Sequence, residues 1–280
     1  MNSIILCKGS SDFVLLQYYM RTVYGWTDER TQNIRLDSIK RSRTLKKDEN
    51  LLTIGGCGGC SKIIPEFEKI LQRNSISAVG EAFDKVVIIT DRDEVGTEEE
   101  FIEKINTSVQ KYQLMMKDDI KNNTWLSCEY QNGHGKKQIM ELLLLVIPFE
   151  DTGAMETFLL NAIANDSAYD AEIIRKGNQF VEEVDKERKY LTKRRYITKS
   201  KFDVYFSIRT AAEQFVERQN ILKRVPWEQY SQIQEEFQKL KDFGIPWTIG
   251  DGDLWLFWCP WWHFIKNRLI MIIYIKRLTV

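Results

Sequence analysis

The sequence has no net charge and few cysteines. The first feature argues against a protein drawn to nucleic acid by its overall charge, and the second argues against a secreted disulfide-bonded protein. Forty basic and forty acidic residues give a formal net charge of zero. No overall field therefore draws the chain to nucleic acid, and any such binding requires a local basic patch. The five cysteines are odd in number and scattered, which argues against a secreted disulfide framework. No signal-peptide pattern precedes the first apolar run, so we expect a cytoplasmic protein.

Two common sites lack their full sequence patterns. Cys57 and Cys60 have the spacing of a zinc or redox pair, but zinc needs two further ligands. There is no second cysteine pair, and His134 and His263 are the only histidines. The glycine-rich run at 55–59 precedes a predicted helix and lets the backbone approach a phosphate or another segment closely. No Gly-Lys-Ser/Thr ends it as in a P-loop, so we interpret it as a tight glycine turn.

No apolar run is long enough to predict a membrane span. The most apolar stretch covers residues 253–275, but Pro260, Lys266 and Arg268 interrupt it. A span needs about 20 residues with few charges. We favour core packing or partner binding for this tail, because a large exposed apolar patch marks an interface. Attachment to a membrane surface is the alternative, because tryptophans favour that interface.

Apolar strands alternate with amphipathic helices along the first half of the chain. The expected strands are at 3–7, 51–54, 86–90, 125–130 and 139–147, and the expected helices are at 13–20, 63–72, 97–117 and 156–163. We interpret residues 28–50 as a solvated loop or a short edge hairpin. This alternation predicts an α/β domain over residues 1–165. A charged, mostly helical region is expected over residues 166–280.

The central predicted strand ends at a pair of carboxylates. Four β-branched apolar residues precede Asp91 and Asp93, whose i, i+2 spacing points both side chains to one side. Such acids repel unless a cation lies between them, and Mg²⁺ prefers carboxylate oxygens. Glu156, in the first turn of a later helix, is a candidate third ligand. The alternatives are a strand-end turn for the aspartates and a favourable helix-dipole position for Glu156.

A basic segment at 186–201 is the main candidate for a nucleic-acid interface. Tyr190 and Tyr196 are interleaved with its charges, which suits phosphate binding and base stacking. The candidate residues are Lys189, Lys193, Arg194, Arg195, Lys199 and Lys201. A solvated helix balanced by Glu182, Glu183 and Asp185 is an equally good interpretation.

Two motifs together resemble the Toprim domain of topoisomerases, primases and overcoming-lysogenization-defect nucleases. They are the apolar strand followed by Lys8-Gly9-Ser10-Ser11-Asp12, and the strand followed by Asp91-Arg92-Asp93. The resemblance covers roughly residues 3–165 and extends to small stand-alone Toprim-like proteins, some of which accompany an ATPase in bacterial anti-phage abortive infection. It implies a Rossmann-like sheet with helices on both faces. It also implies Mg²⁺ or Mn²⁺ on Asp91, Asp93 and Glu156, DNA or RNA cleavage, an ATPase partner and a homodimer.

Lys8 stands where that family carries its catalytic glutamate. A lysine donates hydrogen bonds only, and its ammonium would pair with Asp91 and Asp93 without any ion. We therefore expect a nuclease lineage with little or no cleavage by this chain. A non-catalytic module that docks an ATPase is the second hypothesis, and an unrelated CheY-like domain is the third. Lys8 reflects natural degeneration, a different alignment or, as we favour, an engineered lesion in a toxic nuclease.

Overall fold

The computed structural model describes residues 1–31, 39, 41–78, 80–213 and 217–243. Met1–Gly244 forms one compact unit. The predicted apolar tail at 253–275 lies outside the described residues, as do Cys259 and His263. The predicted boundary between residues 165 and 166 stays a prediction.

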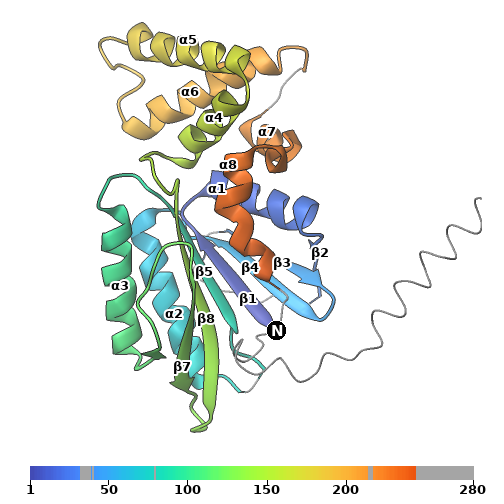
Figure 1. Ribbon diagram of the computed structural model, residues 1–280, viewed down its shortest axis with the longest axis vertical. Helices are drawn as coiled ribbons and strands as arrows, with labels where there is room; N and C mark the ends of the chain where they lie inside the picture. Colours follow the sequence, from blue (N-terminus) through green and yellow to red (C-terminus); the bar gives the residue numbers. More distant parts are fainter. Residues whose placement is uncertain (32–38, 40, 79, 214–216, 244–280) are drawn as a thin grey trace, which may run out of the picture. The chain divides into compact units, whose positions relative to one another are not determined.

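An eight-stranded sheet runs through the centre of the described fold (Figure 1). Its order is β2-β3-β4-β1-β5-β8-β7-β6. The strands are β1 Asn2–Cys7, β2 Thr27–Asp28, β3 Arg41–Lys47, β4 Asn50–Gly56, β5 Lys85–Asp91, β6 Met115–Met116, β7 Trp125–Gln131 and β8 Lys137–Ile147. The four inner strands β4, β1, β5 and β8 are parallel, whereas the outer pairs are antiparallel. Strands buried on both faces need continuous apolar runs, which explains the composition of β1 and β5.

Helices cover both faces of the sheet, which confirms the predicted α/β class. The helices are α1 Ser10–Tyr18, α2 Ile63–Ile76, α3 Thr97–Lys111, α4 Met155–Asp166, α5 Ala168–Val184, α6 Arg194–Arg209, α7 Arg218–Arg224 and α8 Ser231–Phe237. On one face, α2 and α3 pack Phe67 and Phe101 against Ile4 of β1. On the other face, Phe158 of α4 lies in the same core as Ile5. None of the described helices is long and apolar enough to cross a membrane.

The structure shortens one predicted helix and decides between the two interpretations of residues 28–50. The helix predicted to reach residue 117 ends at Lys111, because Gln113 takes a left-handed conformation with φ of 56°. Within the polar segment at 28–50, β3 pairs with β4 as an antiparallel edge hairpin, and β2 pairs with β3. The hairpin alternative is therefore the correct one for the residues of this segment that the structure describes.

The described part of the C-terminal region is helical and belongs to the main core. Trp227 is fully buried, and its indole Nε1–H donates to the carbonyl of Leu222 at 3.0 Å. Its ring meets Phe206 of α6 at a centroid distance of 6.2 Å. Phe237 of α8 packs against Tyr19 in a tilted arrangement, with the ring centroids 4.9 Å apart. The first two contacts join Trp227 to α6 and α7, the third joins α8 to the segment after α1, and all these side chains share one core with the sheet.

We expect Trp227→Ala to destabilise the whole unit by about 3–5 kcal/mol, because it leaves a cavity and frees a buried carbonyl. Urea unfolding followed by far-UV and near-UV circular dichroism should show one transition moved to lower urea. Trp227→Phe, which keeps a ring, should lose much less. A second transition, with the sheet domain unaffected, would contradict the single-core description.

Candidate functional site

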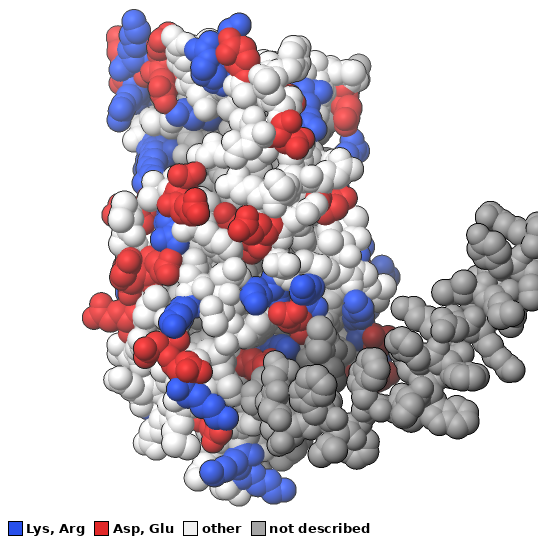
Figure 2. All heavy atoms as spheres, viewed as in Figure 1, with Lys and Arg blue, Asp and Glu red and all other residues white. Residues whose placement is uncertain are grey.

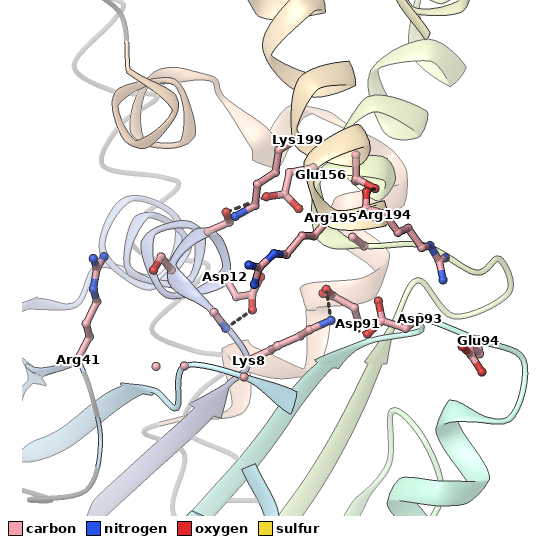
Figure 3. Close-up of a pocket in the computed structure, with 18 residues that line it drawn as sticks. Lys8, Asp12, Arg41, Asp91, Asp93, Glu94, Glu156, Arg194, Arg195 and Lys199 are labelled. Carbon is pink, nitrogen blue, oxygen red and sulfur yellow. Dashed lines mark hydrogen bonds and ion pairs between the residues drawn. The ribbon is translucent and has the colours of Figure 1, made fainter. Parts of the chain in front are cut away.

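The candidate site lies where β1 and β5 end side by side. The two strands are parallel neighbours, with Cys7 of β1 opposite Ile89 of β5. Lys8 and the Asp91/Asp93 pair therefore leave the sheet at the same edge, and a cavity of about 650 Å³ opens there (Figure 3). Its charged lining residues are Lys8, Asp12, Arg41, Asp91, Asp93, Glu94, Glu156, Arg194, Arg195 and Lys199.

Lys8 bridges the two aspartates. Its Nζ donates to Asp91 Oδ2 at 3.1 Å and to Asp93 Oδ2 at 2.5 Å. Both aspartates thus face one side, as their spacing predicts, whereas Arg92 between them donates to the carbonyl of Pro148 at 2.8 Å. Burial lowers the pKa of Lys8, but Asp91 and Asp93 raise it more, so its net pKa lies above the ordinary value. The side chain at position 8 is a fixed ammonium ion.

The glycine turn holds the backbone of Lys8 in place. The amides of Gly58 and Gly59 both donate to the Lys8 carbonyl, at 3.0 and 2.8 Å. These glycines have φ of 84° and 151°, which side-chain-bearing residues rarely adopt. The turn therefore serves close approach between chain segments, as the sequence predicts. Cys57 and Cys60 are free thiols.

Asp12 is a cavity residue that the sequence interpretation missed. The N-cap of α1 is Gly9, whose N–H donates to Asp12 Oδ2 at 2.7 Å. Ser11 Oγ donates to Glu156 Oε1 at 2.9 Å. Glycine has no side chain to cap its own helix, so a carboxylate three residues later bonds to the free amide. The position of Asp12 in the Lys8–Asp12 motif was the available signal.

The buried carboxyls have unusual protonation. Burial raises the pKa of Asp12, and the nearby Glu156 raises it further. The hydrogen bond from the Gly9 amide lowers it, and the net pKa is about 6. Burial and then Asp12 raise the pKa of Asp91, with Lys8 opposing them. Asp91 Oδ1 is buried and has no partner among the described residues. These carboxyls are close enough for each to disfavour ionisation of the next.

The residues as they stand do not fit the predicted divalent cation. The Lys8 ammonium holds one oxygen of Asp91 and one of Asp93. Glu156 accepts from Ser11. Among the described residues, no group of three or more His, Cys, Asp or Glu side chains is placed to hold a metal ion. Binding of Mg²⁺ or Mn²⁺ by Asp91, Asp93 and Glu156 therefore stays a prediction for a chain with a different residue at position 8.

Helix α6 brings three cations to the opposite wall of the cavity. Arg194, Arg195 and Lys199 line it, and within the described part of the chain none of them forms an ion pair. The first turn of α6 contains no acid, and no side chain caps it. Cations at a helix N-terminus oppose the macrodipole, whereas α3 has three glutamates there. A bound anion would relieve this unfavourable arrangement.

The other predicted nucleic-acid residues lie outside the cavity lining. Lys201 pairs with Glu182 of α5 at 2.5 Å, and Lys193 is the N-cap of α6. Lys189 Nζ lies 5.3 Å from the ring centre of Tyr190. Arg41, which the sequence placed in a surface segment, does line the cavity. Its place follows from the hairpin, since antiparallel pairing sets Arg41 opposite Gly56 at the end of β4.

The unpaired cations are a local feature of the surface. Figure 2 shows acidic and basic side chains interspersed over the face it presents, in keeping with the zero net charge. Figure 3 shows Arg194 and Arg195 on one side of the cavity, with Lys8, Asp91 and Asp93 on the other. An anion bound between them would meet the two guanidinium groups on one side and, on the other, the Lys8 ammonium that is paired with the two aspartates.

We expect Asp12→Asn to stabilise the protein at pH 7 by about 1–3 kcal/mol, since each pKa unit corresponds to about 1.4 kcal/mol. The folded-state pKa of about 6 exceeds the ordinary 3.8. The folded state thus binds the proton more tightly, and this residue lowers the unfolding free energy as pH rises from about 4 to 6.

Urea unfolding of both proteins at pH 4 and pH 7 checks this prediction. Asparagine keeps an acceptor for the Gly9 amide, so the two proteins should converge at pH 4. A variant that is less stable at pH 7 would show that ionised Asp12 is favourable in the fold.

Comparison with known proteins gives a family without a known role. The family described as "Protein of unknown function (DUF3226)" matches residues 2–243, and no curated protein matches the chain. Hypothetical protein PH0156 from Pyrococcus horikoshii OT3 is 14% identical, with a TM-score of 0.45 over 85% of this chain and 98% of its own. A glyoxalase/bleomycin resistance protein/dioxygenase family enzyme from Burkholderia phytofirmans PsJN is 12% identical, with a TM-score of 0.17 over 51% and 97%. Likenesses this weak carry no conclusion about function.

Proposed function

The chain belongs to the DUF3226 family, whose function is unknown, and we propose that it binds the phosphodiester backbone of a nucleic acid without cleaving it. The observation that carries the proposal is the Lys8 ammonium between Asp91 and Asp93, opposite unpaired cations of α6 in one cavity. Phosphate contacts dominate nucleic-acid affinity, and they require such a local cationic site when the net charge is zero.

Lys8 performs the electrostatic task of a bound cation. Two aspartates at the strand ends would repel a phosphate, and the single ammonium of Lys8 offsets one of their two charges. Arg194 and Arg195 then face the entering anion with guanidinium groups, which bind phosphate oxygens in pairs. Lys199 and Arg41 add point charges along the same lining. Binding should therefore not need a divalent ion.

Cleavage needs properties that Lys8 lacks. A divalent cation lowers the pKa of its bound water and so generates a nucleophile. A protonated lysine has no free electron pair and cannot act as the base, and the two aspartates keep the pKa of Lys8 high. Burial also raises the pKa of Asp91, which disfavours the ionised carboxylate that a metal ion requires.

The proposed ancestry is Toprim-like. The segment Lys8–Asp12 and the Asp91/Asp93 pair, far apart in sequence, lie at adjacent strand ends. That adjacency supports a nuclease ancestor in which position 8 carried a carboxylate. An ATPase partner, a role in anti-phage defence, a homodimer and a cytoplasmic location rest on the resemblance or the sequence alone and stay predictions.

A protein-binding module is the second candidate. Phe180 and Val184, one turn apart on α5, expose 55% and 58% of their surface. Neighbouring large apolar side chains in water favour a protein partner. This candidate predicts that nucleic acid has no measurable affinity for the cavity.

We expect Lys8→Glu to cleave single- or double-stranded DNA or RNA with Mg²⁺ or Mn²⁺, at a rate at least about 100-fold above that of the unaltered chain. The substitution restores a carboxylate beside Asp91 and Asp93, so that a cation can activate water. Gel analysis of labelled substrates measures the rate. Lys8→Gln, which removes the charge without adding a ligand, should stay inactive. Equal inactivity of Lys8→Glu, with metal binding shown, would oppose the nuclease ancestry.

Thermal unfolding with and without Mg²⁺ tests directly whether the Lys8 ammonium takes the place of a bound metal cation. The unaltered chain should show no rise in Tm at millimolar Mg²⁺, because Lys8 holds the two aspartates. Lys8→Glu should be less stable without metal and gain about 1–3 kcal/mol with it, as expected for a ligand that binds only the folded state. Lys8→Glu/Asp91→Asn should lose that gain. Stabilisation of the unaltered chain by Mg²⁺ would show that Lys8 does not replace a cation.

A further inference from the structure

We infer that the nucleic acid bound at this site is single-stranded, and that Tyr190 and Tyr196 stack on its bases. The inference rests on the proposed function, because it assigns the strand class to the same site. It adds a surface outside the cavity: the loop that joins α5 to α6 and the first turn of α6. We call this surface the tyrosine loop, residues 185–196.

The tyrosine loop is held in shape by one carboxylate. Asp185 accepts the backbone amides of Lys189, Tyr190 and Leu191, at 3.0, 2.9 and 2.7 Å. Those amides lower the pKa of Asp185, so it is ionised at neutral pH. Arg188 takes a left-handed φ of 50° within the turn. The backbone that presents Tyr190 is therefore fixed before any ligand arrives.

Each tyrosine of the loop carries its own cation. Lys189 Nζ lies 5.3 Å from the ring centre of Tyr190, and the Arg195 guanidinium carbon lies 5.0 Å from that of Tyr196. Arg195 also donates to the Tyr196 hydroxyl at 3.1 Å. Tyr190 exposes 72% of its surface and Tyr196 exposes 37%. A cation beside an exposed ring suits a nucleotide, since the phosphate meets the charge and the base stacks on the ring.

The loop continues directly into the cavity wall. Tyr190 is four residues before Arg194, a span of at most about 14 Å. Arg195 belongs to both surfaces, because it lines the cavity and contacts Tyr196. A strand whose phosphate sits at Lys8 and Arg194 can therefore reach the two rings over a few nucleotides.

Stacking on these rings discriminates between strand classes. Bases in a duplex are stacked on one another and offer only their edges in the grooves, whereas bases of a single strand offer their faces. An exposed tyrosine cannot stack on the bases of a duplex, so it adds no affinity for a duplex beyond a hydrogen bond from its hydroxyl group. The surface therefore fits a single strand, and stacking of this kind is tolerant of base sequence.

Fluorescence anisotropy with the full chain tests the inference. The probes are labelled single-stranded DNA and RNA of one mixed sequence, and the duplexes of that sequence, in EDTA over a range of salt. The unaltered protein should bind a single strand more tightly than its duplex. Tyr190→Ala and Tyr196→Ala should each weaken single-strand binding by about 5- to 100-fold. Tyr190→Phe and Tyr196→Phe should retain most of the affinity.

A matched control and a positioning test accompany these variants. Tyr169 of α5 is equally exposed, at 78%, and lies outside both the cavity lining and the tyrosine loop. Tyr169→Ala should leave binding unchanged. Asp185→Ala should weaken single-strand binding, yet it should add little in the Tyr190→Ala background, because Asp185 acts by placing Tyr190.

The outcomes separate this inference from the proposed function. The logarithm of the binding constant falls linearly as the logarithm of the salt concentration rises. Arg194→Ala/Arg195→Ala should make this fall less steep by roughly 1.4, because each lost phosphate contact of a single strand accounts for about 0.7. If the fall becomes less steep but single strands and duplexes bind equally and the tyrosine variants match the unaltered protein, the single-strand inference is wrong and phosphate binding stands. If no probe binds, or the arginine variant changes nothing, the proposed function fails and the inference with it.

Discussion

The ion pair of Lys8 with Asp91 and Asp93 is the constraint on which the site depends. Three charged groups from two neighbouring strands converge where both strands end, and Asp91 is almost fully buried there. Removing Lys8 would leave the carboxylate of Asp91 buried without a cation beside it, which costs several kcal/mol. The ammonium therefore occupies the position between these carboxylates that a hard cation would need.

Helix α6 connects that edge to the rest of the molecule. One face of α6 is basic over its first two turns, with Arg195 and Lys199 at the cavity, and apolar further on, where Phe202 and Phe206 are fully buried. Gly177 of α5 lets α6 approach closely, since a Cβ there would lie 3.2 Å from Val204. The buried half thus sets the position of the basic half. In the described residues, the C-terminal helices and the sheet share one hydrophobic core.

The sequence predicted a substantial part of this arrangement. The parallel strands, the shared side of Asp91 and Asp93, and the pairing of Lys8 with both follow from apolar runs, a two-residue spacing and opposite charges. It did not predict Arg41, whose role depends on hairpin register. It also missed Asp12, because a carboxylate in a helix start is usually a cap, and the burial and the nearby Glu156 that raise its pKa to about 6 arise only in the folded structure. Long-range pairing and burial have no local sequence signature.

What the sequence determined by itself is local and chemical: which strands are apolar enough to be buried, and that a lysine follows the first strand while two aspartates follow the central one. What only the tertiary structure decided is which distant charges share a cavity. Of the six basic residues singled out at 189–201, three face the acids of β5 across the cavity, and Lys201 is paired with α5. The reason is that helix rotation is set by packing of the apolar half of α6, and the same basic residues are otherwise indistinguishable along the chain.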